Sequence, residues 1–114
     1  MPSLTPNELA ELLAAGQPLC LLDVRRRQAR EASGLQIAGA QWQDPALWLD
    51  WKDAVPHDRP VLLYCAHGQE ISQGLTAALR VMGADARHLE GGFSAWQAQG
   101  LATLPTPPAT SLRA

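Results

Sequence analysis

The 114-residue sequence is poor in several features that mark particular classes of protein. It holds only two cysteines, too few for a secreted scaffold built on disulfides. Nine Lys and Arg residues stand against eleven Asp and Glu residues, a formal net charge of -2, so there is no basic excess to neutralise a nucleic-acid backbone. No apolar run approaches the roughly 20 residues that span a bilayer. The sequence therefore predicts neither a nucleic-acid partner nor a membrane partner.

The first residues also lack the positively charged and then apolar pattern of a secretion signal. Together with the small number of cysteines, this absence leads us to expect a cytoplasmic protein. We also expect a monomer or a weak dimer. What the sequence does contain is a hydrophobic fraction of 46% with 18% charged residues, which excludes disorder of the whole chain. The length is that of one domain with one core.

Strand-like and helix-like segments alternate along the chain. Nearly continuous apolar runs at residues 19–24 and 61–64 are typical of strands buried on both faces. Apolar residues recur at helical spacing from Ile71 to Met82. Further strands are expected at 37–42 and 86–89, and further helices between Thr5 and Gly16, from Asp44 to Val55, and from Phe93 to Gln99. This alternation predicts an α/β fold, a mainly parallel sheet with helices on both faces.

The end of the chain has a different composition. Residues 103–114 include three prolines and have lost apolar periodicity. We therefore expect one domain over residues 1–102, followed by a flexible, Pro-rich tail over residues 103–114.

Cys65 directly follows the strand predicted at 61–64 and precedes the next helix. In parallel α/β sheets, ligands bind beyond the carboxyl ends of the strands. A tight turn at this place directs backbone N–H groups inward, and with the positive end of the helix dipole they favour a thiolate at Cys65. The same groups suit a persulfide anion or a substrate oxyanion. The predicted site is thus Cys65 as nucleophile, with a backbone cradle formed by Ala66, His67, Gly68, Gln69, Glu70 and Ile71.

Cys20 and His67 give weaker evidence of a function than Cys65 does. A cysteine that ends a hydrophobic strand is often simply buried, and we apply this interpretation to Cys20, which lies between leucines. Cys65 and His67 alone lack the second pair of ligands of a zinc site, so no metal and no other cofactor is predicted. For His67, contact with substrate or with Glu70 and a solvated turn position both remain open.

Three segments resemble the single-domain rhodanese-like sulfurtransferase family: LDVR at 22–25 leading to IAGA at 37–40, VLLYCAHG at 61–68, and LEGGFSAW at 89–96. The resemblance covers about residues 4 to 100. It implies a parallel sheet of about five strands and a cysteine that cycles through a persulfide. By this resemblance Cys65 takes sulfur from thiosulfate or a persulfide and passes it to cyanide, a thiol or an acceptor protein.

The active-site loop departs from the family pattern C-x-x-G-x-R-S. Glu70 holds the place of the arginine, and Ile71 precedes or replaces the serine. If Glu70 faces the sulfur, it disfavours the thiolate and repels an anionic donor; if it faces outward, it stabilises the start of the helix. Both orientations remain open.

Two alternative functions are compatible with the sequence, and one basic cluster needs an interpretation. A phosphatase or arsenate reductase uses a related cysteine loop, but it needs the arginine that is missing here. A noncatalytic binding or regulatory module would retain the fold without the chemistry. The basic cluster Arg25, Arg26, Arg27 and Arg30 is interpreted as a solvated face rather than a binding site for an anion.

Overall fold

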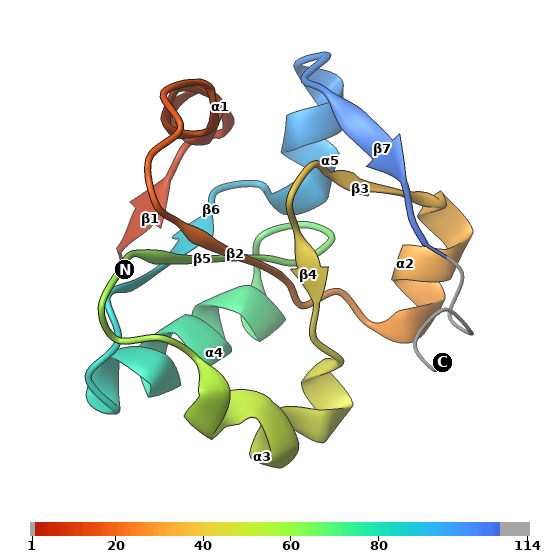
Figure 1. Cartoon of the computed structure of the whole chain (residues 1–114). Helices are drawn as coiled ribbons and strands as arrows, with labels where there is room; N and C mark the ends of the chain where they lie inside the picture. Colours follow the sequence, from red (N-terminus) through yellow and green to blue (C-terminus); the bar gives the residue numbers. More distant parts are fainter. Residues whose placement is uncertain (1, 108–114) are drawn as a thin grey trace.

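The computed structural model describes residues 2–107 and is built around a five-stranded sheet in the order β1-β6-β5-β2-β4. Every neighbouring pair in this sheet is parallel, as the sequence predicts (Figure 1). The strands are β1 (Ser3–Leu4), β2 (Cys20–Asp23), β4 (Gln41–Trp42), β5 (Val61–Tyr64) and β6 (Ala86–Leu89). The α/β fold with a parallel sheet is confirmed.

Helices cover both faces of this sheet (Figure 1). One face carries α1 (Pro6–Ala14) and α5 (Gly92–Ala98), and the other carries α3 (Trp48–Trp51) and α4 (Glu70–Val81). The short 3-10 helices η1 (Pro45–Leu47) and η2 (Lys52–Ala54) flank α3, and α2 (Arg27–Ser33) follows β2. Helix α1 begins as predicted, with a capping box between Thr5 and Glu8. No helix among residues 2–107 combines the length and the hydropathy needed to cross a membrane.

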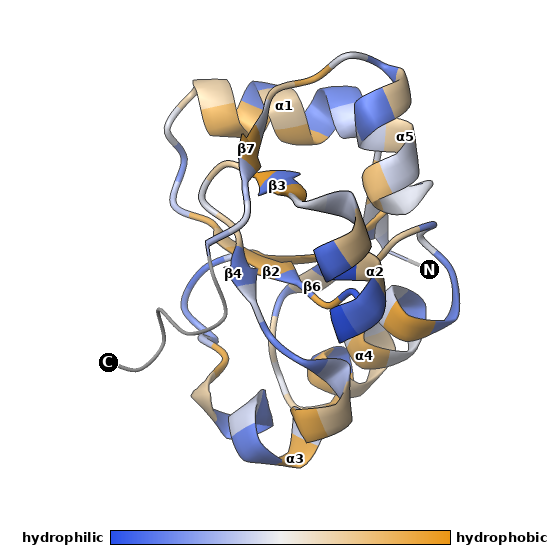
Figure 2. Ribbon diagram, turned by 90° about the vertical axis from the view of Figure 1, so that its right-hand side faces the viewer, coloured by the Kyte–Doolittle hydropathy of each residue, from blue (hydrophilic) through white to orange (hydrophobic). Residues whose placement is uncertain are grey.

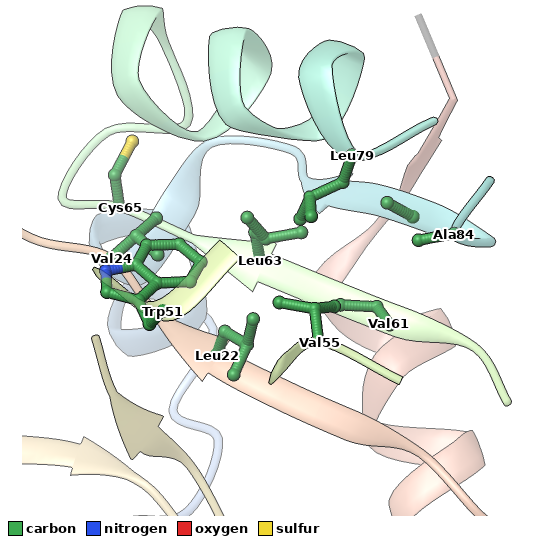
Figure 3. Packing of buried hydrophobic residues seen from close by; sticks show 10 residues of the cluster. Leu22, Val24, Trp51, Val55, Val61, Leu63, Cys65, Leu79 and Ala84 are labelled. Atoms are coloured by element: carbon green, nitrogen blue, oxygen red, sulfur yellow. The ribbon is translucent and has the colours of Figure 1, made fainter. Parts of the chain in front are cut away.

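The core consists of one apolar layer on each face. Alternate residues of β5 divide between them: Leu62 and Tyr64 pack toward α1 and α5, whereas Val61 and Leu63 pack toward α3 and α4. The apolar colour of β2 between the helix layers is visible in Figure 2. Cys65 lies at the end of the second layer, and its sulfur is directed toward the first turn of α4 (Figure 3). The predicted nucleophile is therefore part of the apolar layer under α4.

Two expectations about chain segments are corrected. The strand predicted over residues 37–42 is divided into β3 (Leu35–Ile37) and β4, because a turn containing Gly39 separates them. The flexible tail predicted from residue 103 is wrong for Thr103–Pro105, because these residues form β7 and pair antiparallel with β3. The two strands form a second, two-stranded sheet, which ties the end of the domain to its middle. Residues 108–114 of the predicted tail lie outside the described residues.

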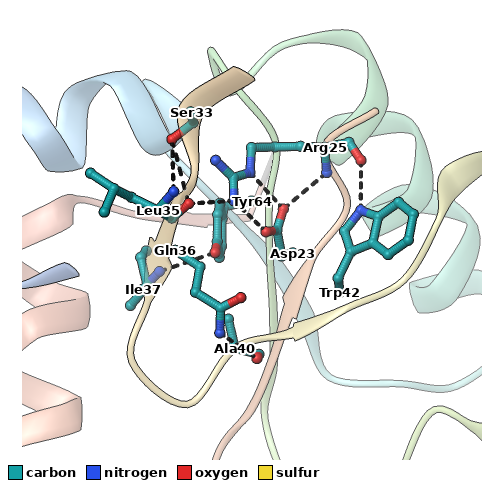
Figure 4. Close-up of polar contacts among 9 residues, drawn as sticks. All are labelled: Asp23, Arg25, Ser33, Leu35, Gln36, Ile37, Ala40, Trp42 and Tyr64. Atoms are coloured by element: carbon teal, nitrogen blue, oxygen red, sulfur yellow. Dashed lines mark hydrogen bonds and ion pairs between the residues drawn. The ribbon is translucent and has the colours of Figure 1, made fainter. Parts of the chain in front are cut away.

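The basic cluster is not the solvated face that the sequence analysis expects. Arg25 is 1% exposed and Arg30 is 7% exposed, whereas Arg26 and Arg27 are exposed. Arg25 lies two residues after Asp23 in extended chain, so both side chains point to the same side and pair there (Figure 4). The guanidinium of Arg30 stacks on the Trp42 ring at 4.9 Å. Two of the four arginines, Arg25 and Arg30, are therefore buried in the protein.

Candidate active site

Cys65 follows the last residue of β5 and is 5% exposed. The turn after it is short, because α4 already begins at Glu70 rather than at Ile71 or Ser72 as expected. The turn therefore consists of Ala66, His67, Gly68 and Gln69, and the expected cradle residues Glu70 and Ile71 form the first turn of α4. The structure places all the predicted site residues in this one turn and helix start.

The start of α5 holds the turn in place. The N–H of Phe93 donates to the carbonyl of Cys65 at 2.9 Å, and the N–H of Ser94 donates to the carbonyl of Ala66 at 2.9 Å. In a trans peptide the N–H points opposite to the carbonyl of the same unit. The N–H groups of Ala66 and His67 are thereby directed away from α5, and these amides remain available to another acceptor.

The contact between the turn and α5 depends on two glycines with left-handed backbone. Gly68 has φ 71° and Gly92 has φ 61°. A Cβ atom on Gly92 would lie 2.4 Å from the carbonyl oxygen of Cys65, and one on Gly68 would lie 2.6 Å from the N atom of Gly91. No side chain fits at either position, so the backbones meet directly.

The backbone N–H groups that follow Cys65 are unusually free. Between residues 66 and 72, none donates a hydrogen bond to an acceptor in the part of the chain that the structure describes. Free amides at the start of a helix, next to a sulfur atom, stabilise negative charge on that atom or on a bound anion. This arrangement suits a thiolate, a persulfide or an oxyanion equally well.

The Ser72 hydroxyl adds a side-chain contact to the sulfur. Its Oγ lies 3.1 Å from Cys65 Sγ, and the side chain is 0% exposed. From the sequence, Ser72 is expected only as the family serine displaced by one position. The available signal was helix periodicity, because Ser72, Thr76 and Leu79 form the buried side of α4.

His67 is exposed and is held at one ring nitrogen. Its Nδ1 and the Ser94 Oγ share a hydrogen bond of 3.0 Å. The ring contributes to the wall of the hollow above Cys65. His67 is therefore an exposed turn residue that is anchored to Ser94, and it forms no ion pair with Glu70 among the contacts of residues 2–107.

A hollow of about 210 Å³ opens onto Cys65. Its wall is formed by the turn, by the start of α4 and by the segment after β2. The two charged side chains of this wall that are exposed are Arg26 and Glu70. Arg25 also contributes to the wall, but its guanidinium is bound to Asp23 and lies 4.4 Å from the centre of the Phe93 ring. Glu70 thus contributes to the wall of the hollow and also lies in the first turn of α4, where its charge interacts favourably with the helix dipole.

Cys20 lies apart from the hollow that opens onto Cys65. It is the half-buried first residue of β2, at the other end of the sheet from the hollow, and both cysteines are free thiols. Burial raises the pKa of the Cys20 thiol, an effect that the nearby Arg59 opposes only in part. Cys20 packs as an uncharged thiol against the apolar layer under α4.

The model of the rhodanese-like domain family matches residues 5–99 of the sequence. The chain belongs to this family. A curated relative, the probable adenylyltransferase/sulfurtransferase MoeZ of Mycobacterium tuberculosis, is 35% identical over 99 residues. That match covers 85% of this chain and 25% of the relative, so the chain spans about a quarter of the relative's length.

Solved structures show the same rhodanese-like fold. A rhodanese-like domain protein from Staphylococcus aureus is 28% identical with a TM-score of 0.75, covering 84% of this chain and 91% of that one. Thiosulfate sulfurtransferase from Pseudomonas aeruginosa is 25% identical with a TM-score of 0.74, covering 91% of this chain and 19% of that one. The rhodanese-like fold expected from the three sequence segments is thereby confirmed.

Proposed function

We propose that this rhodanese-like chain is a sulfurtransferase that carries sulfane sulfur on Cys65. The observation that supports this most directly is the Ser72 hydroxyl at 3.1 Å from the Cys65 sulfur, at the start of a helix whose first amides donate to no acceptor among residues 2–107. These groups stabilise negative charge on sulfur, which both the attacking thiolate and the persulfide product carry. The family relationship and the sulfurtransferase names of two relatives agree with this chemistry.

The reaction has two balanced steps. With thiosulfate as donor, the Cys65 thiolate attacks the outer sulfur, the S–S bond of the donor breaks, and sulfite leaves with the bonding pair. In the second step an acceptor thiolate or cyanide attacks the outer sulfur of the Cys65 persulfide. The bonding pair then returns to Cys65 as thiolate, and the sulfur leaves on the acceptor.

The two alternative functions receive less support from the site. A phosphatase or arsenate reductase clamps its oxyanion with an arginine of the cysteine loop, and this turn has Glu70 at that place. Arg25 does not replace it, because its charge is already paired with the Asp23 carboxylate; Nε and Nη2 donate to Asp23 and to the carbonyl of Leu35, and Nη1 alone has no partner among residues 2–107. A noncatalytic module has no need for the hydroxyl contact to Cys65 or for free amides beside it.

The proposal is tested by mass spectrometry of the intact, reduced protein after incubation with thiosulfate and, separately, with a low-molecular-weight persulfide. One bound sulfur adds about 32 Da. We expect this increase for the unmodified chain and for Cys20→Ser, but not for Cys65→Ser. If the folded protein gains no sulfur from either donor, or if Cys65→Ser gains it equally, the sulfurtransferase function is wrong.

A further inference from the structure

A hollow of about 710 Å³ lies at the opposite end of the sheet from Cys65. Part of its wall is formed by α1, and another part by residues 58–60 together with Arg87 of β6. Pro18 and Pro60, which lie just before β2 and β5, also belong to the wall. The hollow is therefore at the amino ends of these two strands, and a partner bound here leaves the hollow above Cys65 open.

The charges on the wall of this hollow are separated by sign. Helix α1 contributes Glu8 and Glu11, which are exposed and form no ion pair with any residue between 2 and 107. The other part contributes Arg59 and Arg87, each 46% exposed. An aspartate of its own segment lies 3.6 Å from Arg59 and another lies 3.8 Å from Arg87, both too far for a hydrogen bond. The donors of both arginines therefore remain available to a partner.

Apolar side chains form much of the remaining wall. Leu4 and Leu19 are half-buried and pack against the apolar layer under α1, and Leu12 of α1 is also half-buried. Pro18 and Pro60 are exposed. A partner that covers these atoms removes apolar surface from water, which favours association.

This combination defines what the partner must carry. It needs cations opposite Glu8 and Glu11, anions opposite Arg59 and Arg87, and apolar side chains beside both. The same wall of a second copy, turned by a two-fold rotation, meets these needs, because each contact between α1 and the arginines then occurs twice. The wall is thus complementary to itself in charge.

We propose that this wall is the interface of a two-fold symmetric dimer of the chain. The exposed turn of residues 57–60 of each copy enters the hollow of the other, where Arg59 contacts Glu11 and Arg87 contacts Glu8. Twelve residues of each copy form the wall, against about 20–30 on each side of a stable interface, so the dimer is weak and dissociates on dilution.

Sedimentation velocity of the full chain tests the proposal over concentrations from about 10 μM to about 1 mM, the range in which weak complexes dissociate. We expect the mean mass to rise with concentration from that of one chain toward that of two, and to rise less at high ionic strength. Glu11→Arg and Arg59→Glu should each weaken the dimer roughly tenfold, because either change places two like-charged pairs in the interface.

Mixing the two variants gives the sharpest comparison. In a dimer of one Glu11→Arg chain and one Arg59→Glu chain, opposite charges meet again at both contacts. We therefore expect the equimolar mixture to associate as strongly as the unmodified chain. The matched control is Asp53→Arg, which changes the net charge by the same amount as Glu11→Arg at an exposed residue outside this hollow. We expect this control to leave the dimer unchanged.

Three results would overturn the inference: a chain that stays monomeric up to about 1 mM, a dimer that neither charge reversal weakens, or a mixture that associates no more than its two components do. Circular dichroism of each variant checks that the exposed substitutions leave the fold intact. The masses do not depend on sulfur chemistry, so failure of Cys65 to accept sulfur would reject the proposed function alone.

Discussion

Arg25 holds Asp23 by two parallel hydrogen bonds, from Nε to Oδ1 at 2.9 Å and from Nη2 to Oδ2 at 2.6 Å, with both side chains almost fully buried. Nη2 also donates to the carbonyl of Leu35 at 2.8 Å, and Tyr64 Oη accepts from the N–H of Ile37. The ion pair and this hydroxyl together fasten β3 to the carboxyl ends of the central strands (Figure 4). Tyr64 stays protonated there, because burial and then the charge of Asp23 raise the pKa of its hydroxyl.

Removal of one charge from this pair should destabilise the domain strongly. Asp23→Asn leaves the buried Arg25 guanidinium without a counter-charge, which costs about 3–5 kcal/mol of unfolding free energy. Urea denaturation followed by circular dichroism measures the loss. The matched control is Asp58→Asn, whose partner Arg59 lies 3.6 Å away on the surface, and it should change the urea midpoint little. An unchanged midpoint for Asp23→Asn would show that the pair does not stabilise the fold.

The buried ion pair is a feature that could not be predicted from the sequence. The strands and helices with strong apolar periodicity, and the position of Cys65 after β5, could be predicted because each depends on local pattern. Burial of Arg25 and Arg30 could not, because it depends on partners, Asp23 and the Trp42 ring, whose positions only the fold determines.

The short strands were missed for a similar reason. β1 and β7 have two and three residues, too few for a pattern, and they exist because β6 and β3 offer free edges to pair with. Within the site, the loop residues could be predicted from their order in the chain. The contact from Ser72 to Cys65 could not, because the exact start of α4 decides which residue of its first turn faces the sulfur.

Gly92→Ala should detach the active-site turn from α5. Its Cβ atom would lie 2.4 Å from the Cys65 carbonyl, so the hydrogen bonds from α5 to the turn cannot form as they do now. The control is Gly100→Ala, which has a similar left-handed φ of 70° but open space around its Cβ position. We expect Gly92→Ala to lose sulfur loading in the intact-mass assay. Gly100→Ala should load normally, at a cost of about 1–2 kcal/mol in stability from backbone strain. Equal loading by the two variants would contradict the role given to the close approach at Gly92.

Ser72→Ala should slow the reaction of Cys65. The hydroxyl lies 3.1 Å from Sγ, and a hydrogen bond to a charged group contributes about 1.5–3 kcal/mol, a reduction of roughly 10- to 150-fold in the fraction of Cys65 present as thiolate. The rate of alkylation by iodoacetamide across a pH series measures this. A shift of the whole profile indicates that Ser72 stabilises the thiolate, whereas a purely structural role would leave the profile in place.

Thr76→Val provides the control on the same side of α4. The Thr76 hydroxyl is buried and has no hydrogen-bond partner among residues 2–107, so its replacement by an isosteric methyl group costs no interaction. We expect unchanged alkylation at Cys65 and equal or greater stability. Should Thr76→Val alter the alkylation profile as Ser72→Ala does, the effect would belong to helix packing and not to the hydroxyl.

Glu70→Arg should improve the use of thiosulfate. Glu70 forms part of the wall of the hollow above Cys65, so we expect its replacement by a cation to change repulsion of the anionic donor into attraction. We expect the KM for thiosulfate to fall several-fold in a steady-state assay with cyanide as acceptor, and the effect to shrink at high ionic strength. Asp44→Arg, at a residue that does not form part of the wall of the hollow above Cys65, should have a smaller effect. A KM that does not respond to Glu70→Arg would place the donor away from this side chain.

The stability of the domain should decline in mild acid because of His88. This residue lies in β6, is 6% exposed, and its Nδ1 has no partner in the described part of the chain. Burial lowers the pKa of its imidazole, an effect that the backbone of Leu89 and the charge of Glu90 oppose only in part. The unfolded chain therefore takes up a proton near pH 6.5, where the folded chain still excludes it. The stabilisation due to the neutral ring is complete above about pH 6.5. It is lost as the pH falls toward the lower pKa of His88 in the folded protein, by at most about 1.4 kcal/mol per pH unit.

Urea midpoints measured between pH 8 and pH 5.5 should show this slope for the unmodified chain. The slope should be smaller for His88→Gln and unchanged for His57→Gln, since His57 is exposed. An equal slope in all three proteins would assign the acid sensitivity to groups other than His88.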